Sequence, residues 1–392
     1  MLCPVFVFPS QIRTFVVKFA GEGVRDNGGV YTEVFSSIME ELQSHTDPPT
    51  LPYFIRTPNA RSGTGSYQDA WMPSPRETSH AALEAFRFIG QIIGMAIRGK
   101  VQLNFNVTPC FWKQLIGGSA AAPLGLADLE STDANVANLV SKMREQAKIM
   151  RAAAADASSS SSSSGTALAG IEPDEFGSMF GVENFTCVLS DGVTVAELVP
   201  GGASKPVTLD NFEEWIILMI DARVHECAIQ IAALRSGLAS LIPLHLLCFF
   251  TPAEAERLVC GVSDFPVELL QSVTIYEGAM REDLEYVRWF WETLRDFTSA
   301  QKAQFLRFTF ARERMPARPA ELGIKFKMQE PNARTAKDPD QHFPSTHTVS
   351  RRTNAMRPAG RARRSDLCVV AKRMRAHGSR NCAHMFCVWS AV

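Results

Sequence analysis

The feature that most constrains the fold is an apolar repeat at helical spacing, which returns in one segment after another between residues 31 and 310. In Tyr31–Ser44 the apolar residues follow the i, i+3, i+4, i+7 order that places them on one face of a helix. The same spacing predicts helices over about Ala81–Arg98 and Asp283–Phe297, and others starting near Asp210 and Thr251. The sequence therefore predicts a mainly helical protein whose helices bury one stripe each.

Local signals mark where some of these helices begin. Thr251-Pro252-Ala253-Glu254 is typical of a helix start, because the threonine can cap, the proline lacks an N–H that would be unpaired there, and the glutamate can return a bond. Asp210, with Glu213 three residues later, resembles the same capping box. Within Ala81–Arg98, small residues such as Gly90 are expected to let a neighbouring element approach closely.

Two stretches interrupt the helical pattern. Residues 152–170 contain seven consecutive serines flanked by Ala and Gly, and we expect a flexible insert there because such a segment buries too little apolar surface to offset its chain entropy. After Thr348 the apolar periodicity stops and arginines accumulate. Residues 350–392 hold ten basic side chains and one acid, Asp366, whereas 30 basic and 40 acidic residues precede them. The formal net charge of -1 thus hides an acidic body and a basic tail, which we expect to be disordered.

Several enzyme classes lack their minimal motifs in this sequence. No Gly-x-Ser-x-Gly elbow or His-Glu-x-x-His motif occurs. The glycines at 21, 23, 28 and 29 match neither a dinucleotide fingerprint, which wants glycine at Asp26, nor a P-loop, so they predict a turn. His225-Glu226-Cys227 would point in directions about 100 degrees apart on a helix, which favours a surface or core role over metal binding. We expect neither a cofactor nor a metal site.

Apolar runs and cysteines bear on the compartment. The longest apolar runs, near Ile89–Ile97 and Leu241–Phe250, are shorter than the roughly 20 residues of a membrane span. The start Met1-Leu2-Cys3-Pro4 lacks a positively charged n-region, so no signal peptide is expected. Nine cysteines without a Cys-x-x-Cys pair favour a reducing compartment, the cytoplasm or nucleus.

Eight short blocks follow one another in a fixed order over about residues 11–348. They are Val17–Tyr31, then Phe88–Arg98 with Pro109–Leu115, Leu198–Gly202, Phe250–Pro252 with Cys260-Gly261, Trp289–Trp291, Phe305–Phe308, Arg314–Ala317 and Pro344–Thr348. This series resembles the HECT-type ubiquitin ligase domain. Arg98 and the Arg314–Ala317 block look most like the large HECT ligases that also carry RCC1-type repeats, which this chain does not contain.

The resemblance implies an α+β, bilobal fold with a mostly helical N-lobe, small sheets and a truncated α/β C-lobe. The implied boundaries are an extension at 1–10, the N-lobe at 11–275, an E2-binding subdomain at about 104–195 that carries the insert, a hinge at 276–280 including Tyr276, Glu277 and Gly278, the C-lobe at 281–348 and a non-family tail at 349–392. The implied partners are a ubiquitin-charged E2, ubiquitin and protein substrates. Neither a membrane nor nucleic acid is an expected partner.

The sequence departs from the family at the position that matters for chemistry. In HECT ligases a cysteine that accepts ubiquitin as a thioester directly follows a His-Thr or similar pair, and here His347 and Thr348 are followed by Val349. Valine has no nucleophile, and the family's following aromatic residue and closing segment are absent as well. The chain as written is therefore predicted to be deficient in thioester formation, with no catalytic residue of its own.

Other interpretations of this end of the chain stay open. Position 349, where the family has its thioester cysteine, is called the thioester slot. Cys368, Cys382 and Cys387 lie 19 or more residues beyond this slot. They are disfavoured as replacement nucleophiles, because a misplacement of about 1 Å can cost roughly 100-fold in rate. Val349-Ser350 can be encoded by GTGAGT, a common intron start, so the tail can be translated intron sequence. A genuine basic tail that binds nucleic acid is the other explanation, although aromatic interleaving is absent. The alternative function is a non-catalytic E2-binding or scaffold module.

Overall fold

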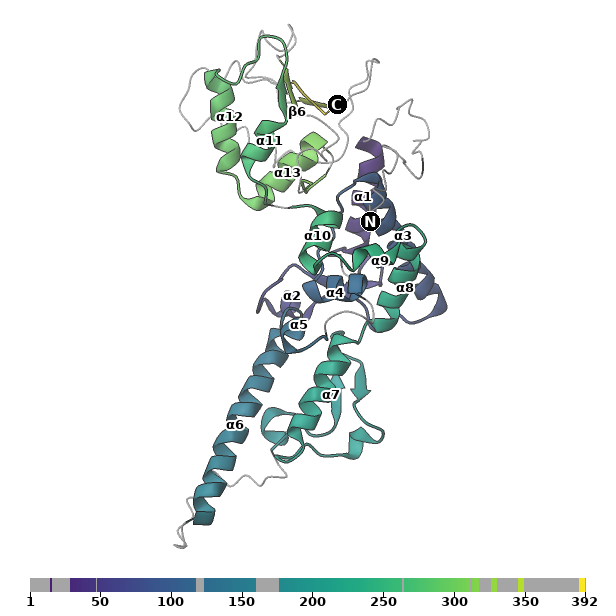
Figure 1. The fold of residues 1–392 in the computed structure, drawn as a ribbon, viewed down its shortest axis with the longest axis vertical. Helices are drawn as coiled ribbons and strands as arrows, with labels where there is room; N and C mark the ends of the chain where they lie inside the picture. Colours follow the sequence, from purple (N-terminus) through teal and green to yellow (C-terminus); the bar gives the residue numbers. More distant parts are fainter. Residues whose placement is uncertain are drawn as a thin grey trace, which may run out of the picture. The chain divides into compact units, whose positions relative to one another are not determined.

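The computed structural model describes residues 15, 29–46, 48–117, 123–159, 176–262, 264–310, 312–316, 326–329, 345–348 and 388–391. These residues form α-helices and three small sheets (Figure 1), which confirms the predicted α+β class. Contacts divide the chain into two compact units. The first contains residues 1–41, 92–105 and 256–392, and the second contains residues 42–91 and 106–255. None of the helices in the described part of the chain is long and apolar enough to span a bilayer.

In the second unit, a small hairpin and a pair of crossed helices form the base. Strand β1 (Phe54–Arg56) pairs antiparallel with β2 (Trp71–Pro73). Short helix α2 (Pro58–Ser62) follows β1, with Thr57 capping its start. The crossed pair consists of the first part of α3 (His80–Gly99) and α8 (Ala228–Ala239). Helices α4 (Pro109–Gly117) and α9 (Leu244–Leu247) also belong to this part of the unit.

Helices α3 and α8 cross at two glycines. A Cβ atom at Gly90 would lie 2.0 Å from the Leu234 carbonyl oxygen, and one at Gly237 would lie 1.8 Å from the Arg87 carbonyl oxygen. Any larger residue would force the two backbones apart. The prediction that Gly90 admits a neighbouring element is confirmed.

The serine-rich segment differs from the prediction in its first half. Helix α6 runs over Ala134–Ser159, so the expected flexible insert is wrong for residues 152–159. Four alanines follow Arg151, and alanine has the highest helix propensity, so the helix continues where we expected a loop. The rest of the predicted insert, residues 160–170, lies outside the described residues.

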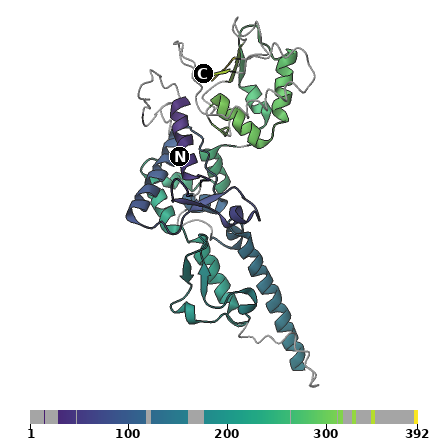
Figure 2. The ribbon, with the colours of Figure 1, turned by 180° about the vertical axis from the view of Figure 1, so that it is seen from behind.

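The first unit contains a four-stranded sheet surrounded by helices. Its strands are β5 (Thr274–Tyr276), β6 (Phe326–Gln329), β7 (Ser345–Thr348) and β8 (Val388–Ala391), in the order β5-β6-β8-β7. Figures 1 and 2 show α11 (Val267–Ser272), α12 (Glu285–Arg295) and α13 (Ser299–Phe310) gathered around β6. Helix α1 (Gly29–Leu42) belongs to this unit up to residue 41, and helix α10 (Pro252–Cys260) belongs to it from residue 256 onward.

Strand β8 corrects the expectation of a disordered tail. Val388–Ala391 pairs antiparallel with β6 and parallel with β7, so these four residues are ordered into the sheet. Valine and tryptophan favour strands, and the facing edges of β6 and β7 offer backbone partners on both sides. The other residues of the 349–392 tail lie outside the described part of the chain.

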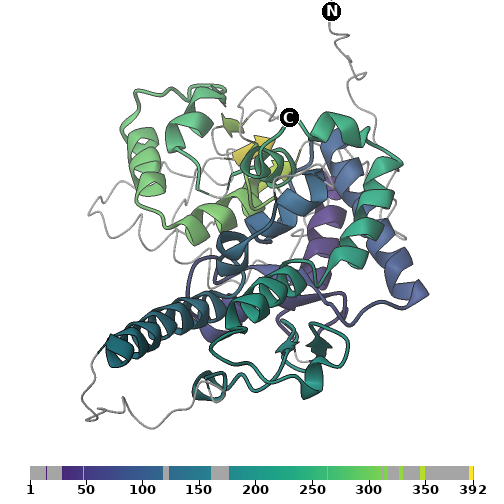
Figure 3. The ribbon, with the colours of Figure 1, turned by 60° about the horizontal axis from the view of Figure 1, so that its bottom comes forward.

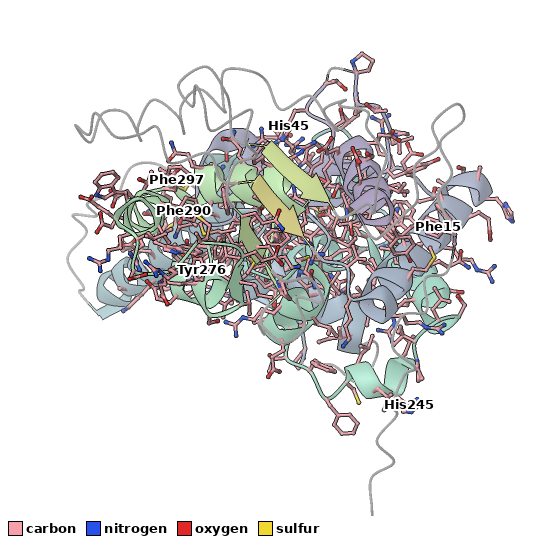
Figure 4. All side chains as sticks on the ribbon, turned by 90° about the horizontal axis from the view of Figure 1, so that it is seen from above. Phe15, His45, His245, Tyr276, Phe290 and Phe297 are labelled. Carbon is pink, nitrogen blue, oxygen red and sulfur yellow. The ribbon has the colours of Figure 1, made fainter. Side chains whose placement is uncertain are left out.

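Aromatic side chains fill the core between these helices and the sheet. The ring of Phe290 on α12 lies 4.8 Å from Trp291 and 6.0 Å from Phe305, measured between centroids, and β6 adds Phe326. Phe290 and Phe297 appear near Tyr276 in the view from above (Figure 4). The apolar stripe predicted for this segment is thus buried as a helix face.

One predicted helix start is confirmed and one is wrong. Thr251 N–H donates to the Glu254 carboxylate at 2.8 Å, and Glu254 N–H donates to Thr251 Oγ1 at 3.3 Å, which is the expected capping box. At the other site, α7 (Phe212–Val224) begins after Asn211 rather than Asp210. Asn211 Oδ1 accepts from Thr208 N–H at 2.8 Å, so it stabilises the preceding turn and makes no bond to the helix.

Candidate functional site

The candidate site is a subdomain of the second unit built on the long helices α6 and α7, which lie side by side in all the ribbon views (Figure 3). Its other elements are α5 (Leu126–Glu130), strands β3 (Thr186–Val188) and β4 (Val195–Glu197), and the short 3-10 helices η3 (Ser178–Phe180) and η4 (Gly202–Ser204). We call this the α6/α7 subdomain.

A separate apolar core holds the α6/α7 subdomain together. Val140 and Met143 on α6 are fully buried in one cluster with Phe176 and Phe212, whose ring centroids are 5.0 Å apart. At the surface, Arg144 on α6 holds Glu213 on α7 through Nη2 at 3.0 Å and Nε at 3.1 Å. Such a core lets the subdomain present a fixed outer surface.

The hairpin of β3 and β4 is fixed at its turn and at its base. Asp191 Oδ1 accepts from the N–H groups of Val193 and Thr194 at 3.0 and 2.9 Å, and Gly192 adopts φ 76°, a left-handed conformation that suits glycine. At the base, Trp215 Nε1 on α7 donates to the Thr186 carbonyl at 3.2 Å. The hairpin is therefore anchored to α7.

Three valines on this hairpin are exposed. Val188 and Val195 are cross-strand partners with 49% and 60% of their surface exposed, and Val193 in the turn is 65% exposed. We call these three residues the hairpin patch. Met179 and Ile217 are also exposed in the same subdomain. Apolar groups gathered on a rigid surface are typical of protein docking sites. Sequence reasoning missed the patch, although the Asp191-Gly192 turn between apolar runs was a usable hairpin signal.

A buried charged cluster joins the hairpin to both long helices. Arg223 Nη2 near the end of α7 donates to Asp133 Oδ2 at 2.8 Å and to Ser190 Oγ at 3.0 Å. Ser190 in turn donates to the Glu226 carboxylate through its N–H at 2.8 Å and its hydroxyl at 2.5 Å. Burial raises the pKa of Glu226, and the charge of Arg223 opposes that rise. Asp133 also accepts from Val136 N–H, so the cluster reaches the first turn of α6.

The sequence triplet His225-Glu226-Cys227 does not converge on one point. His225 Nδ1 lies 3.0 Å from the Asp221 carbonyl oxygen, whereas the Cys227 thiol donates to the Pro73 carbonyl at 3.1 Å. Glu226 belongs to the buried cluster. The predicted surface or core role of these residues is confirmed.

The described cysteines are mostly unsuited to nucleophilic chemistry. Burial raises the pKa of Cys110 and Cys187 to about 11 and that of Cys260 to about 12, and it raises the pKa of Cys227 well above its ordinary value. The thiolate is the reactive form, so these four thiols are poor nucleophiles at neutral pH. Cys248 is the exposed cysteine among the described residues, and its thiol donates to the His245 carbonyl at 2.8 Å.

The residues predicted to flank the thioester slot lie on a sheet strand. His347 and Thr348 are the last two residues of β7, paired in register with Ser390 and Ala391 of β8. Helix α13 packs against this strand. Val349, the slot itself, lies outside the described residues, as do the more distant cysteines at 368, 382 and 387.

The predicted hinge residues stand at the end of β5. The Tyr276 hydroxyl accepts from Trp291 Nε1 at 3.0 Å. Glu277 N–H donates to the Met328 carbonyl at 2.9 Å, and the Glu277 carboxylate lies 2.6 Å from Lys327 Nζ. Gly278 has φ 73°. A hinge role for these residues stays a prediction.

Comparison with known protein families identifies the family of this chain. Residues 41–351 match the family described as HECT-domain (ubiquitin-transferase), which is well over half of the chain. The chain belongs to the HECT-domain family. The resemblance drawn from the eight sequence blocks is thereby confirmed.

Curated relatives agree with the family. The chain is 32% identical over 337 residues to the E3 ubiquitin-protein ligase HERC2 of Homo sapiens, and equally to that of Mus musculus, in both cases over 86% of this chain. It is 27% identical over 306 residues to the E3 ubiquitin-protein ligase RSP5 of Chaetomium thermophilum, covering 78% of this chain and 32% of that protein. This HECT chain spans only about 6% of the length of HERC2.

Proposed function

We propose that this chain is a HECT-type ubiquitin transferase domain that receives a ubiquitin-charged E2 but fails to form its own ubiquitin thioester. The observation that carries the proposal is Val349, which follows His347-Thr348 inside the matched range 41–351. Transfer to an enzyme requires a sulfur that attacks the E2 thioester and becomes the new acyl carrier. Valine supplies none, and four of the five described thiols are buried with a raised pKa.

The α6/α7 subdomain is the proposed E2-docking region. Its hairpin patch falls within residues 104–195, the range that the family resemblance implies for E2 binding. Binding would remove the three exposed valines from water, and the buried cluster around Arg223 would hold them in place without reordering. Protein substrates would then receive ubiquitin only in a form of the domain that carries the cysteine. We propose that the chain binds E2 in the cytoplasm or nucleus.

E2 binding tests the docking proposal. An E2 carrying ubiquitin in a stable linkage is titrated with the chain, and with its Val193→Asp and Val195→Asp variants. Each variant is expected to bind about tenfold more weakly or worse, because a buried charge replaces apolar contact at the interface. Ile229→Asp on α8, where the parent side chain is 56% exposed outside the subdomain, serves as the matched control and is expected to bind like the parent. Equal affinity for all four proteins would contradict docking at the hairpin patch.

The same observation at Val349 supports a second candidate, a non-catalytic E2-binding or scaffold module. The two candidates differ in what a restored nucleophile does. Replacing Val349 and the tail by a cysteine and a family-like C-terminus is expected to recover ubiquitin transfer if the domain is a transferase by design. A restored protein that binds E2 without accepting ubiquitin would favour the scaffold.

A further inference from the structure

The exposed hairpin patch and a buried serine share one short stretch of chain. Val188 and Val193, with 49% and 65% of their surface exposed, lie on either side of Ser190, which is 1% exposed. Strands β3 and β4 pair at three positions, and a two-stranded hairpin is marginally stable at best on its own in water. The direction in which the valines face therefore depends on the side chains that hold Ser190 and Asp191.

Glu226 holds this loop from the junction between α7 and α8. Its Oε2 accepts from Ser190 N–H at 2.8 Å, and its Oε1 accepts from Ser190 Oγ at 2.5 Å. The Glu226 side chain is only 2% exposed, so water competes little for these bonds. Because two oxygens of one carboxyl group bond two atoms of Ser190, the contact fixes the orientation of the loop as well as its position.

Arg61 holds the same loop through its carbonyl groups. It lies on α2, outside the α6/α7 subdomain, and donates through Nη2 to the Ser190 carbonyl and through Nη1 to the Asp191 carbonyl at 3.5 Å. Ser190 thus has its N–H bonded to Glu226 and its carbonyl bonded to Arg61. We call Glu226 and Arg61 the grip.

The other members of the buried cluster mainly join the two long helices. Arg223 Nη2 reaches Ser190 at the hydroxyl oxygen, at 3.0 Å, and binds Asp133 at 2.8 Å. Asp133 in turn accepts from Val136 N–H in the first turn of α6. The grip, by contrast, bonds the backbone of the loop. Loosening the grip would therefore free the loop while the bond between Arg223 and Asp133 stays in place.

We propose that Glu226 and Arg61 are positioning residues for E2 docking, which hold the hairpin patch in its binding orientation before E2 arrives. The inference rests on the proposed docking of E2 at the hairpin patch. Glu226 is too buried to touch E2, so it acts through Ser190. A chain without the grip would present the patch correctly for only part of the time, and its apparent affinity falls by that fraction. The association rate carries this loss, because the contacts between the patch and E2 in the finished complex are unchanged.

Binding kinetics on the full chain test the grip, with an E2 that carries ubiquitin in a stable linkage as the probe. Glu226→Ala and Arg61→Met are each expected to lower the association rate about tenfold and to leave the dissociation rate unchanged. Glu226→Gln keeps an oxygen that accepts from Ser190 N–H, and it is expected to recover most of the association rate lost in Glu226→Ala. Leu234→Ala, at a fully buried α8 position, is the control for lost stability and is expected to associate like the parent.

Hydrogen exchange without E2 tests the grip in the free chain. The amides of Val193 and Thr194 bond Asp191 Oδ1 inside the loop, so their exchange reports its order. Glu226→Ala is expected to speed exchange at both amides at least about tenfold and to leave the α3 amides unchanged. Unchanged exchange at Val193 and Thr194 would overturn the proposal.

The kinetic outcomes separate this inference from the docking proposal on which it rests. Val195→Asp is expected to raise the dissociation rate, because it removes contact in the finished complex. If Val195→Asp binds more weakly while Glu226→Ala keeps the parent's association rate, the grip is overturned and docking at the hairpin patch stands. If Val195→Asp binds like the parent, docking at the hairpin patch is overturned and this inference with it. Leu234→Ala associating as slowly as Glu226→Ala would also overturn the inference, because lost stability alone would then explain both.

Discussion

The crossing of α3 and α8 makes a sharp prediction about Gly90. Glycine to alanine inside a helix normally stabilises by about 1 kcal/mol, because alanine has the higher helix propensity. At Gly90, however, the new Cβ would stand 2.0 Å from the Leu234 carbonyl oxygen and 2.8 Å from its carbon. Both are backbone atoms, so relief requires the two helices to separate by roughly 1 Å, at an overpacking cost near the top of the usual 1–3 kcal/mol. We expect Gly90→Ala to lower the free energy of unfolding by about 2 kcal/mol.

Gly99 on the same helix provides the control for this variant. A Cβ at Gly99 would have its nearest neighbours at 3.6–3.7 Å, which is ordinary contact. Gly99→Ala is therefore expected to be neutral or stabilising. Urea unfolding followed by far-UV circular dichroism measures both variants against the parent. If Gly90→Ala is as stable as Gly99→Ala, the close crossing of α3 and α8 is refuted.

Three further predictions follow from the described contacts. Burial raises the folded-state pKa of Glu226 above its ordinary value, so its contribution to stability is complete at pH below the unfolded pKa and is lost as pH rises through the folded pKa. Glu226→Gln should therefore gain stability relative to the parent as pH rises above the ordinary carboxyl pKa. Urea-derived stability curves of the two proteins that run parallel with pH would count against this. Thr251→Ala removes a helix cap and should cost about 1 kcal/mol in urea unfolding, whereas no measurable loss would exclude a stabilising capping box. Deleting residues 388–392 removes β8 and should speed exchange of the β6 amides about tenfold; unchanged protection would show that β8 does not pair with β6 in solution.

Local patterns predicted the helices well because their causes are local. The apolar stripe of α3 follows from spacing alone, and Phe86 and Ile93 on it are fully buried. The capping box at Thr251 needs only residues three apart. The capping box predicted at Asp210 is wrong because the helix begins after Asn211, whose side chain stabilises the turn Thr208–Asn211. The spacing rule for capping boxes does not distinguish Asp210 from Asn211 as the residue before the helix.

The candidate site depended more on distant pairings. Asp133 and Arg223 are 90 positions apart, so no window of sequence brings their charges together. Whether Val193 and Val195 are exposed likewise depends on which face of the hairpin packs on α7. A three-residue strand such as β4 is too short for the alternation of apolar and polar residues to predict that face. The family resemblance, by contrast, was readable from ordered blocks of sequence, and the family match over residues 41–351 confirms it. The departure from the family at Val349 stays a prediction.

The central claim is that this HECT chain binds a charged E2 but cannot take over its ubiquitin. The direct test mixes the chain with E2 carrying ubiquitin as a thioester, quenches within seconds, and divides each sample between gels with and without reductant. We predict an E2 complex in solution and no ubiquitin adduct on the chain under either condition, because position 349 carries no sulfur. A ubiquitin adduct on the chain that survives the non-reducing gel and disappears with reductant would contradict the claim.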